Sequence, residues 1–115
     1  MRRYRILLAA DVPLDLERIE EHLVRSYSDF GEDETSAAER AAERIAGALA
    51  YMETFHVQPH RGTEHPEVLL GIRNVTHERF IYYFRVGDPA GEVRILAVFF
   101  GGVEHRRQIA DRLRR

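Results

Sequence analysis

The spacing of apolar residues predicts an opening strand followed by two helices. Residues 4–10 form a short apolar run, and we expect the first strand there. An amphipathic helix follows, from Asp11 as its N-cap to about Ser26. Its apolar face is expected to consist of Leu16, Ile19, Leu23 and Tyr27.

The pattern from Ser36 to Glu39 is that of a capping box, which predicts the start of a second helix. Its inner face is expected to consist of Ala38, Ala41, Ala42, Ile45, Leu49 and Met52. These small side chains favour close packing, so the two helices are predicted to form an antiparallel hairpin. Residues 56–67, rich in His, Pro and Gly, are expected to form a loop.

Three further strands are predicted at residues 69–75, 79–86 and 92–102, and a short helix over residues 104–115. In the middle strand, alternation turns Phe80, Tyr82, Phe84 and Val86 toward the helices and leaves Arg79, Ile81, Tyr83 and Arg85 on the other face. In the last strand, the same alternation leaves Arg94, Leu96, Val98 and Phe100 outward. Because Leu96, Val98 and Phe100 are apolar, we expect either the terminal helix or a strand from a partner to cover them.

This order of elements defines an α+β fold with two layers. It comprises an N-terminal strand, an antiparallel two-helix hairpin, a three-stranded antiparallel meander and a short C-terminal helix. The first strand is expected to join the meander, and the hairpin to cover one face of the sheet. With 115 residues the chain can bury one modest core, so we expect a single domain over residues 1–115.

Composition narrows the possible chemistry. The chain has no Cys, which excludes disulfides and thiolate metal sites and fits a reducing cytoplasm. All 17 basic residues are Arg, so lysine chemistry is excluded. Residues 1–55 carry 7 Arg and 12 acidic residues, a net charge of −5, whereas residues 56–115 carry 10 Arg and 7 acidic residues, a net charge of +3. No apolar run reaches the roughly 18 residues of a membrane span, and the N-terminus reads as a strand rather than a signal peptide.

The element order and several local motifs resemble the RelE/ParE superfamily of toxins from type II toxin–antitoxin operons, also called plasmid stabilisation proteins. The resembling segments are Tyr4-Arg5-Ile6-Leu7, residues 15–19, residues 59–63, Gly71-Ile72-Arg73, residues 80–86 and residues 93–102. The resemblance implies a RelE/ParE-like fold and a small cytoplasmic toxin that arrests growth. It also implies neutralisation by a cognate antitoxin, whose C-terminal segment wraps around the toxin in a hetero-oligomer.

The resemblance leaves the target open between two branches. ParE-like members block DNA gyrase, and RelE-like members cleave messenger RNA on the ribosome. The absence of lysines and the long hairpin favour the ParE-like branch, which acts by binding and not by catalysis. A third alternative is a non-toxic family member that serves as a binding module. No cofactor is expected in any of these cases.

Candidate residues follow from the strand pattern. The expected antitoxin- or target-binding set is Arg73, Arg85, Arg94, Leu96, Val98 and Phe100. If the protein is instead a ribonuclease, the candidates are Arg61, Arg73, Tyr83, Arg85, His105 and Arg106. In that case His105 transfers protons near neutral pH, and Arg106 stabilises charge at phosphorus.

The alternative for Arg61 and Arg73 is a salt bridge to a local acid, Glu64 or Glu67.

Four histidines lie close together in sequence, but their spacing is not that of metal ligands. These histidines are His56, His60, His65 and His77. No metal site is therefore expected.

Overall fold

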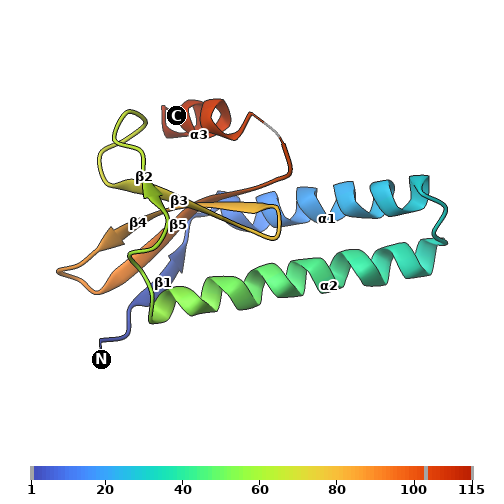
Figure 1. Cartoon of the computed structure of the whole chain (residues 1–115), viewed down its shortest axis with the longest axis horizontal. Coiled ribbons are helices and arrows are strands. Elements are labelled where there is room, and N and C mark those ends of the chain that lie inside the picture. The colour runs from blue at the N-terminus through green and yellow to red at the C-terminus, as the bar shows by residue number, and fades with distance from the viewer. Residues whose placement is uncertain (1, 103, 115) are drawn as a thin grey trace.

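The computed structural model describes residues 2–102 and 104–114, in which helices cover both faces of a five-stranded sheet (Figure 1). The elements are β1 (Arg5–Leu8), α1 (Asp11–Asp29), α2 (Glu34–Glu53), the 3₁₀ turn η1 (Thr54–His56), β2 (Thr63–Glu64), β3 (Ile72–His77), β4 (Phe80–Gly87), β5 (Glu92–Phe100) and α3 (His105–Leu113). This is the expected α+β order, with the short β2 as an addition inside the predicted loop. Arg115, the last residue of the predicted terminal helix, lies outside the described residues.

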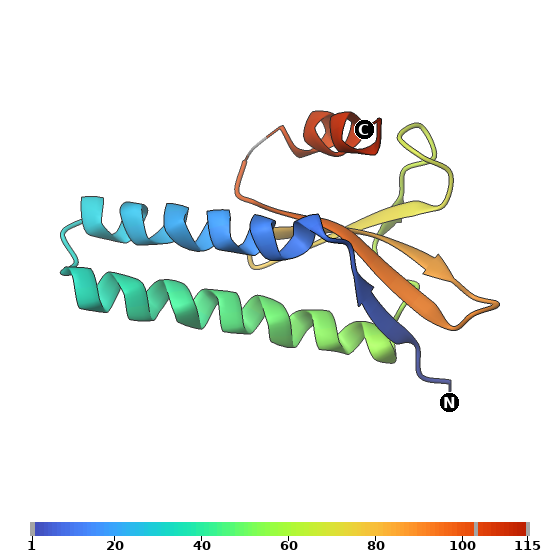
Figure 2. The same cartoon turned by 180° about the vertical axis from the view of Figure 1, so that it is seen from behind.

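The sheet has the strand order β1-β5-β4-β3-β2 (Figure 2). The last three strands form the predicted antiparallel meander, and β1 joins it by pairing in parallel with β5. The connection from β1 to β5 therefore crosses over through the helical hairpin. Both edges of the sheet are short strands, β1 on one side and β2 on the other.

The helices α1 and α2 form the predicted antiparallel hairpin, which extends well beyond the sheet (Figure 1). The predicted capping box at Ser36 is wrong. The helix α2 begins earlier, at Glu34, because the carboxylate of Asp33 accepts a hydrogen bond from the Ser36 N–H at 2.8 Å. The buried residues of α2 are Ala37, Ala41, Ala48 and Met52, so the inner face differs in part from the predicted one. Among the described residues, no helix is long and apolar enough to cross a membrane.

The sheet carries an apolar cluster on each face. The larger cluster lies between the hairpin and the inner face, where α1 and α2 meet Tyr82, Phe84 and Ile95. The smaller one lies on the outer face, where Ile109 of α3 covers a patch of the sheet. The sheet residues of that patch are Ile72, Ile81, Tyr83, Ala97 and Phe99. The terminal helix therefore covers the outer face, as expected for Leu96, but the other β5 residues under it are Ala97 and Phe99 and not Val98 and Phe100. It adds a partial third layer.

A β-bulge at Leu96 corrects the predicted faces of β5. Tyr83 pairs with Ala97, but Phe84 pairs with Ile95, so Leu96 has no partner on β4. Beyond the bulge every side chain changes face. Val98 and Phe100, expected to be outward, instead lie in the inner cluster and are 1% and 8% exposed. They are therefore part of the core and do not form an outward binding strip.

Candidate functional site on the outer face of the sheet

The outer face, turned away from the hairpin, brings together most of the predicted site residues. Tyr83 and Arg85 lie two residues apart on β4, and Arg94 lies opposite Arg85 on β5. Leu96 packs against the outer apolar cluster, and α3 supplies His105 beside Tyr83. Alternation along β4 positions these side chains as predicted, because β4 itself is regular.

Arg85 and Arg94 form a pair of like charges on neighbouring strands. Their Cα atoms are register partners, and both side chains are exposed. Among the residues that the structure describes, neither guanidinium has a carboxylate partner. The nearby Glu92 lines the same shallow surface depression but forms an ion pair with Arg5. Like charges directly opposite each other destabilise a sheet, so this pair is suited to receive an anionic group.

Tyr83 and His105 are joined by a hydrogen bond between the Tyr83 hydroxyl and His105 Nδ1, at 2.8 Å. Burial raises the pKa of Tyr83, so its hydroxyl stays protonated, and the tautomer of His105 decides which of the two atoms donates this bond. Burial, with the nearby Arg106, lowers the pKa of His105. His105 is therefore neutral near pH 7, which fits a group that exchanges protons. Tyr83 itself is fully buried, so a ligand reaches its hydroxyl only if α3 moves.

The sequence did not single out a second buried polar group, centred on His65, that lies beside Tyr83. His65 Nε2 contacts Asn74 Oδ1 at 2.8 Å, and His65 Nδ1 contacts Glu67 Oε1 at 3.1 Å. Asn74 is the register partner of Tyr83, and the His65 and Tyr83 rings are 6.4 Å apart. Only the pairing of β2, β3 and β4 brings these residues together. The sequence feature that could have indicated this polar group is the spacing of His65 and Glu67, two residues apart in the loop.

Arg61 and Arg73 lie away from this site. Arg73 pairs with Phe84 in register, which places it on the inner side of the sheet, and its guanidinium contacts Glu64 at 3.0 Å. Arg61 donates to the Thr54 and Gln58 carbonyl oxygens at 2.9 and 2.7 Å. It thereby closes the end of the hairpin. The salt-bridge alternative thus describes Arg73, and the single arginine surface expected from the sequence is divided between two faces.

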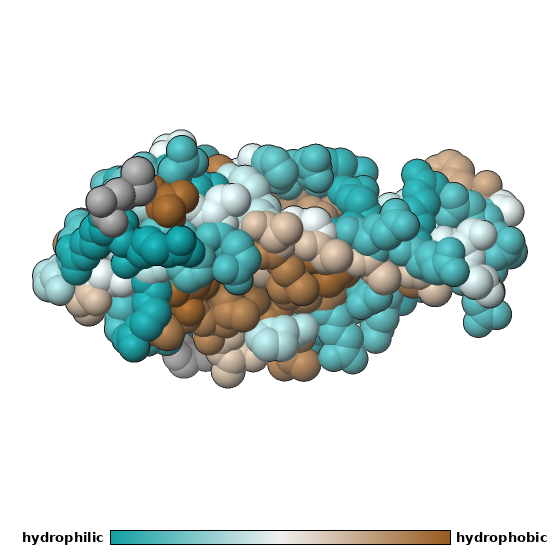
Figure 3. Space-filling view, turned by 90° about the horizontal axis from the view of Figure 1, so that it is seen from below, coloured by the Kyte–Doolittle hydropathy of each residue, from teal (hydrophilic) through white to brown (hydrophobic). Residues whose placement is uncertain are grey.

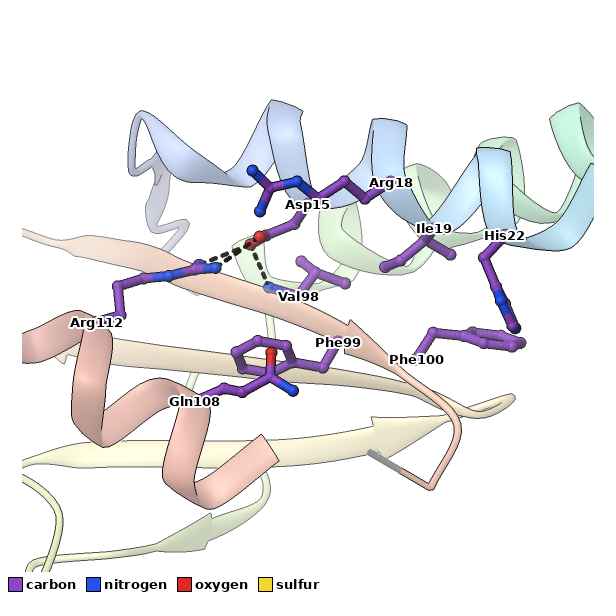
Figure 4. A pocket seen from close by; sticks show the side chains of 9 residues that line it. All are labelled: Asp15, Arg18, Ile19, His22, Val98, Phe99, Phe100, Gln108 and Arg112. Atoms are coloured by element: carbon purple, nitrogen blue, oxygen red, sulfur yellow. Dashed lines mark hydrogen bonds and ion pairs between the residues drawn. The ribbon is translucent and has the colours of Figure 1, made fainter. Parts of the chain in front are cut away.

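A salt bridge from α1 holds α3 against the sheet. The buried carboxylate of Asp15 accepts two hydrogen bonds from Arg112, at 2.7 and 2.8 Å, and a third from the Val98 N–H at 3.0 Å (Figure 4). Arg112 also lies over the Phe99 ring, 5.4 Å from its centre. Because these contacts link α1, β5 and α3, the position of His105 depends on them.

A groove of about 220 Å³ runs beside this salt bridge, between α1 and α3. Its floor is apolar, from Ile19 and the end of β5, and its rim carries Arg18, His22 and Gln108 (Figure 4). The His22 and Phe100 rings are 6.2 Å apart at one end. Within the described ranges, no group of three or more His, Asp or Glu side chains is placed to hold a metal ion.

Comparisons with known proteins support the fold. No family model matches the chain, and no curated protein matches it in sequence. A solved structure of the chromosomal ParDE toxin–antitoxin system from P. aeruginosa matches with a TM-score of 0.66 at 20% identity, covering 87% of this chain and 98% of the other. The toxin–antitoxin complex RelBE2 from Mycobacterium tuberculosis matches with a TM-score of 0.58 at 13% identity, covering 86% and 99%. The chain therefore has the RelE/ParE fold.

Proposed function

We propose that this protein is the toxin of a toxin–antitoxin pair, of the ParE-like branch, and that it acts in the cytoplasm. It arrests growth by binding a target such as DNA gyrase, and a cognate antitoxin neutralises it. The observation that carries this proposal is the shared fold over nearly the whole length of a ParDE chain. The likeness to RelBE2 is compatible with the same class of protein.

The outer face supplies the binding surface in this proposal. Arg85 and Arg94 repel each other in the free protein, and an acidic partner segment relieves that repulsion when it binds. An antitoxin tail that is acidic and disordered folds as it meets this surface. Leu96, half-buried beside Arg94, is the apolar contact that remains from the expected set. Arg73, on the other side of the sheet, is not part of this surface.

The direct test is expression in a bacterial host. The gene expressed alone is expected to arrest growth, and co-expression of the small gene beside it is expected to restore growth. The purified protein is expected to inhibit gyrase in a DNA supercoiling assay. Soluble expression at a high level without any effect on growth contradicts the toxin assignment.

The second candidate function is a ribosome-dependent endoribonuclease, and the bond between Tyr83 and His105 favours it. A neutral His105 can exchange a proton with a ribose hydroxyl or a leaving oxygen, and Arg106 beside it can stabilise the charge at phosphorus. The complete burial of Tyr83 under α3 weighs against this candidate, because the pair is closed to a substrate in the described conformation.

Transcript analysis separates the two candidates. A nuclease cleaves messages soon after induction, and His105→Ala abolishes both cleavage and toxicity. His22→Ala, on the exposed face of α1, is the matched control and leaves both unchanged. Under the ParE-like proposal, messages stay intact and His105→Ala remains toxic. Tight binding of the antitoxin with neither effect indicates the third class, a non-toxic binding module.

A further inference from the structure

The strand β1 leaves part of its backbone free at the edge of the sheet. The N–H groups of Arg5 and Ala9 donate to Gly91 and Ile95 of the β5 side, at 2.8 and 2.9 Å. Because strand backbone groups alternate in direction, those of Ile6 and Leu8 point away from β5. No strand of the described residues lies on that side.

The open part of this edge is short and well defined. The Tyr4 N–H points to the same side but is bound to the His56 carbonyl oxygen at 2.8 Å. After Leu8 the chain turns into α1. The free donors and acceptors are therefore those of Ile6 and Leu8, two of each.

Apolar side chains are exposed on β1 and on both helices of the hairpin. Leu8 is 44% exposed at the end of β1, Leu14 is 49% exposed in α1, and Leu49 is 45% exposed on α2. Seen from the side of α2, apolar side chains form a band across the middle of the molecule (Figure 3). Natural edge strands are usually protected by shortness, charges, proline or a bulge. The strand β1 is short and begins with the charged Arg5, but Ile6, Leu7 and Leu8 carry no charge, proline or bulge. An edge of this kind is suited to pairing.

We propose that β1 is the interface between two copies of this chain, paired antiparallel across a two-fold axis at Leu7. In this register Ile6 of each copy lies opposite Leu8 of the other. Each such pair exchanges two backbone hydrogen bonds, so all the free groups of both edges are satisfied. A shift by two residues would instead place Leu8 opposite Tyr4, whose N–H is already bound.

Charge favours a second copy as the occupant. The chain is basic just before β1, at the exposed Arg2 and Arg3, and acidic on the exposed surface of α1, at Glu17. An antiparallel two-fold axis brings the basic end of each copy toward the acidic end of the other. The edge is therefore complementary to itself in hydrogen bonding and charge.

The first test is the oligomeric state of the full chain, measured by sedimentation velocity over a wide range of concentration. We expect a reversible dimer. Leu8→Arg is expected to raise the dimer dissociation constant by roughly 100-fold, because it places a charge twice in an apolar interface. Leu70→Arg, at a site that is 78% exposed and away from β1, is the matched control and stays dimeric. Circular dichroism checks that both variants are folded.

Amide hydrogen exchange tests the register. The Ile6 and Leu8 amides are expected to be protected in the dimer and to lose protection on dilution, whereas the Tyr4 amide stays protected throughout. A monomer at every concentration overturns the proposal. A dimer that Leu8→Arg does not weaken, or one in which the Ile6 and Leu8 amides exchange freely, also overturns it. Protection that arises only when a different protein is added assigns the edge to that protein and not to a second copy.

Discussion

At the scale of single residues, Asp15 is the most consequential side chain in the structure. Its carboxylate is 5% exposed and satisfies both the guanidinium of Arg112 and the backbone N–H of Val98. Nothing in the sequence pattern indicates this role, since Asp15 stands within an amphipathic helix where acids are common. The partner is 97 residues away along the chain, and only the complete fold brings the two together.

Asp15→Ala should therefore lower the free energy of unfolding by about 3 kcal/mol, because it leaves the buried Val98 N–H unsatisfied and leaves Arg112 with the more distant carboxylate of Asp11, at 3.6 Å. Urea denaturation measures the loss. Asp111→Ala is the matched control, because Asp111 forms an exposed pair with Arg114, and its effect should be near zero. The double variant Asp15→Ala with Arg112→Ala should lose less than the two single losses added together. A single-variant loss under about 1 kcal/mol would contradict this account.

At the scale of elements, the sequence correctly predicted the features that hydrophobic periodicity determines. The helical spacing of Leu16, Ile19 and Leu23 and the alternation along β4 each gave the correct element and the correct face. It failed where two local signals competed. Asp and Ser are both residue types that favour the N-cap position, and here the carboxylate of Asp33, not Ser36, caps α2 and determines where the helix starts. Alternation also could not locate the bulge, because the four residues after Leu96 are all apolar.

The Asp33 cap of α2 predicts how the stability of the protein depends on pH. The hydrogen bond from the Ser36 N–H holds the pKa of Asp33 below its usual value. A lowered folded-state pKa means that the stabilisation is present above the usual Asp range and is lost as pH falls through the folded-state value. Asp33→Ala should thus be less stable than wild type at pH 7 and equal to it in acid.

The matched comparison for the cap is Ser36→Ala, which keeps the donating N–H and removes only the smaller contribution of the Ser36 hydroxyl, so it should lose less stability at pH 7 than Asp33→Ala does. Thermal unfolding at neutral and acid pH measures both variants. If Ser36→Ala were the more damaging change, the capping box predicted from the sequence would have been the correct cap after all.

The helix α3 gives a second prediction at this scale. A chain that ends at Gly102 lacks the cover over Ile81, Tyr83 and Phe99, and it leaves Asp15 without Arg112. The exposed apolar surface should bind the dye ANS and promote aggregation. Fluorescence titration and light scattering measure the two effects. A soluble truncated chain with no ANS signal would mean that α3 contributes little to the outer face.

At the scale of the whole molecule, charge is separated between the acidic hairpin and the more basic sheet. The proposed acidic antitoxin should be attracted to the sheet, so the variant Arg85→Glu with Arg94→Glu should slow association while changing dissociation less. Added salt should slow association of the wild type in the same way. Arg25→Glu on the exposed surface of α1 is the control. Equal association rates for wild type and double variant at low salt would place the antitoxin elsewhere, on the hairpin.

The candidate site shows the same division between local and global information. Tyr83, Arg85 and Arg94 could be grouped from the sequence, because regular alternation decides which face they share. Arg61 and Arg73 could not be separated from them, because their positions depend on η1 and on the pairing of β3. The contacts of His65 likewise depend on the pairing of β2 with β3, which brings it beside Asn74. Long-range pairing is the information that a single sequence does not display.

The bulge at Leu96 also affects how this chain should be aligned with others of the same fold. A relative with a regular last strand must be aligned with a one-residue gap at Leu96, in the middle of a strand, where insertions are least expected. An ungapped alignment would match the core residues Val98 and Phe100 to outward positions of the relative. Residue-by-residue transfer of function past this point is therefore safe only after the strands have been superimposed in three dimensions.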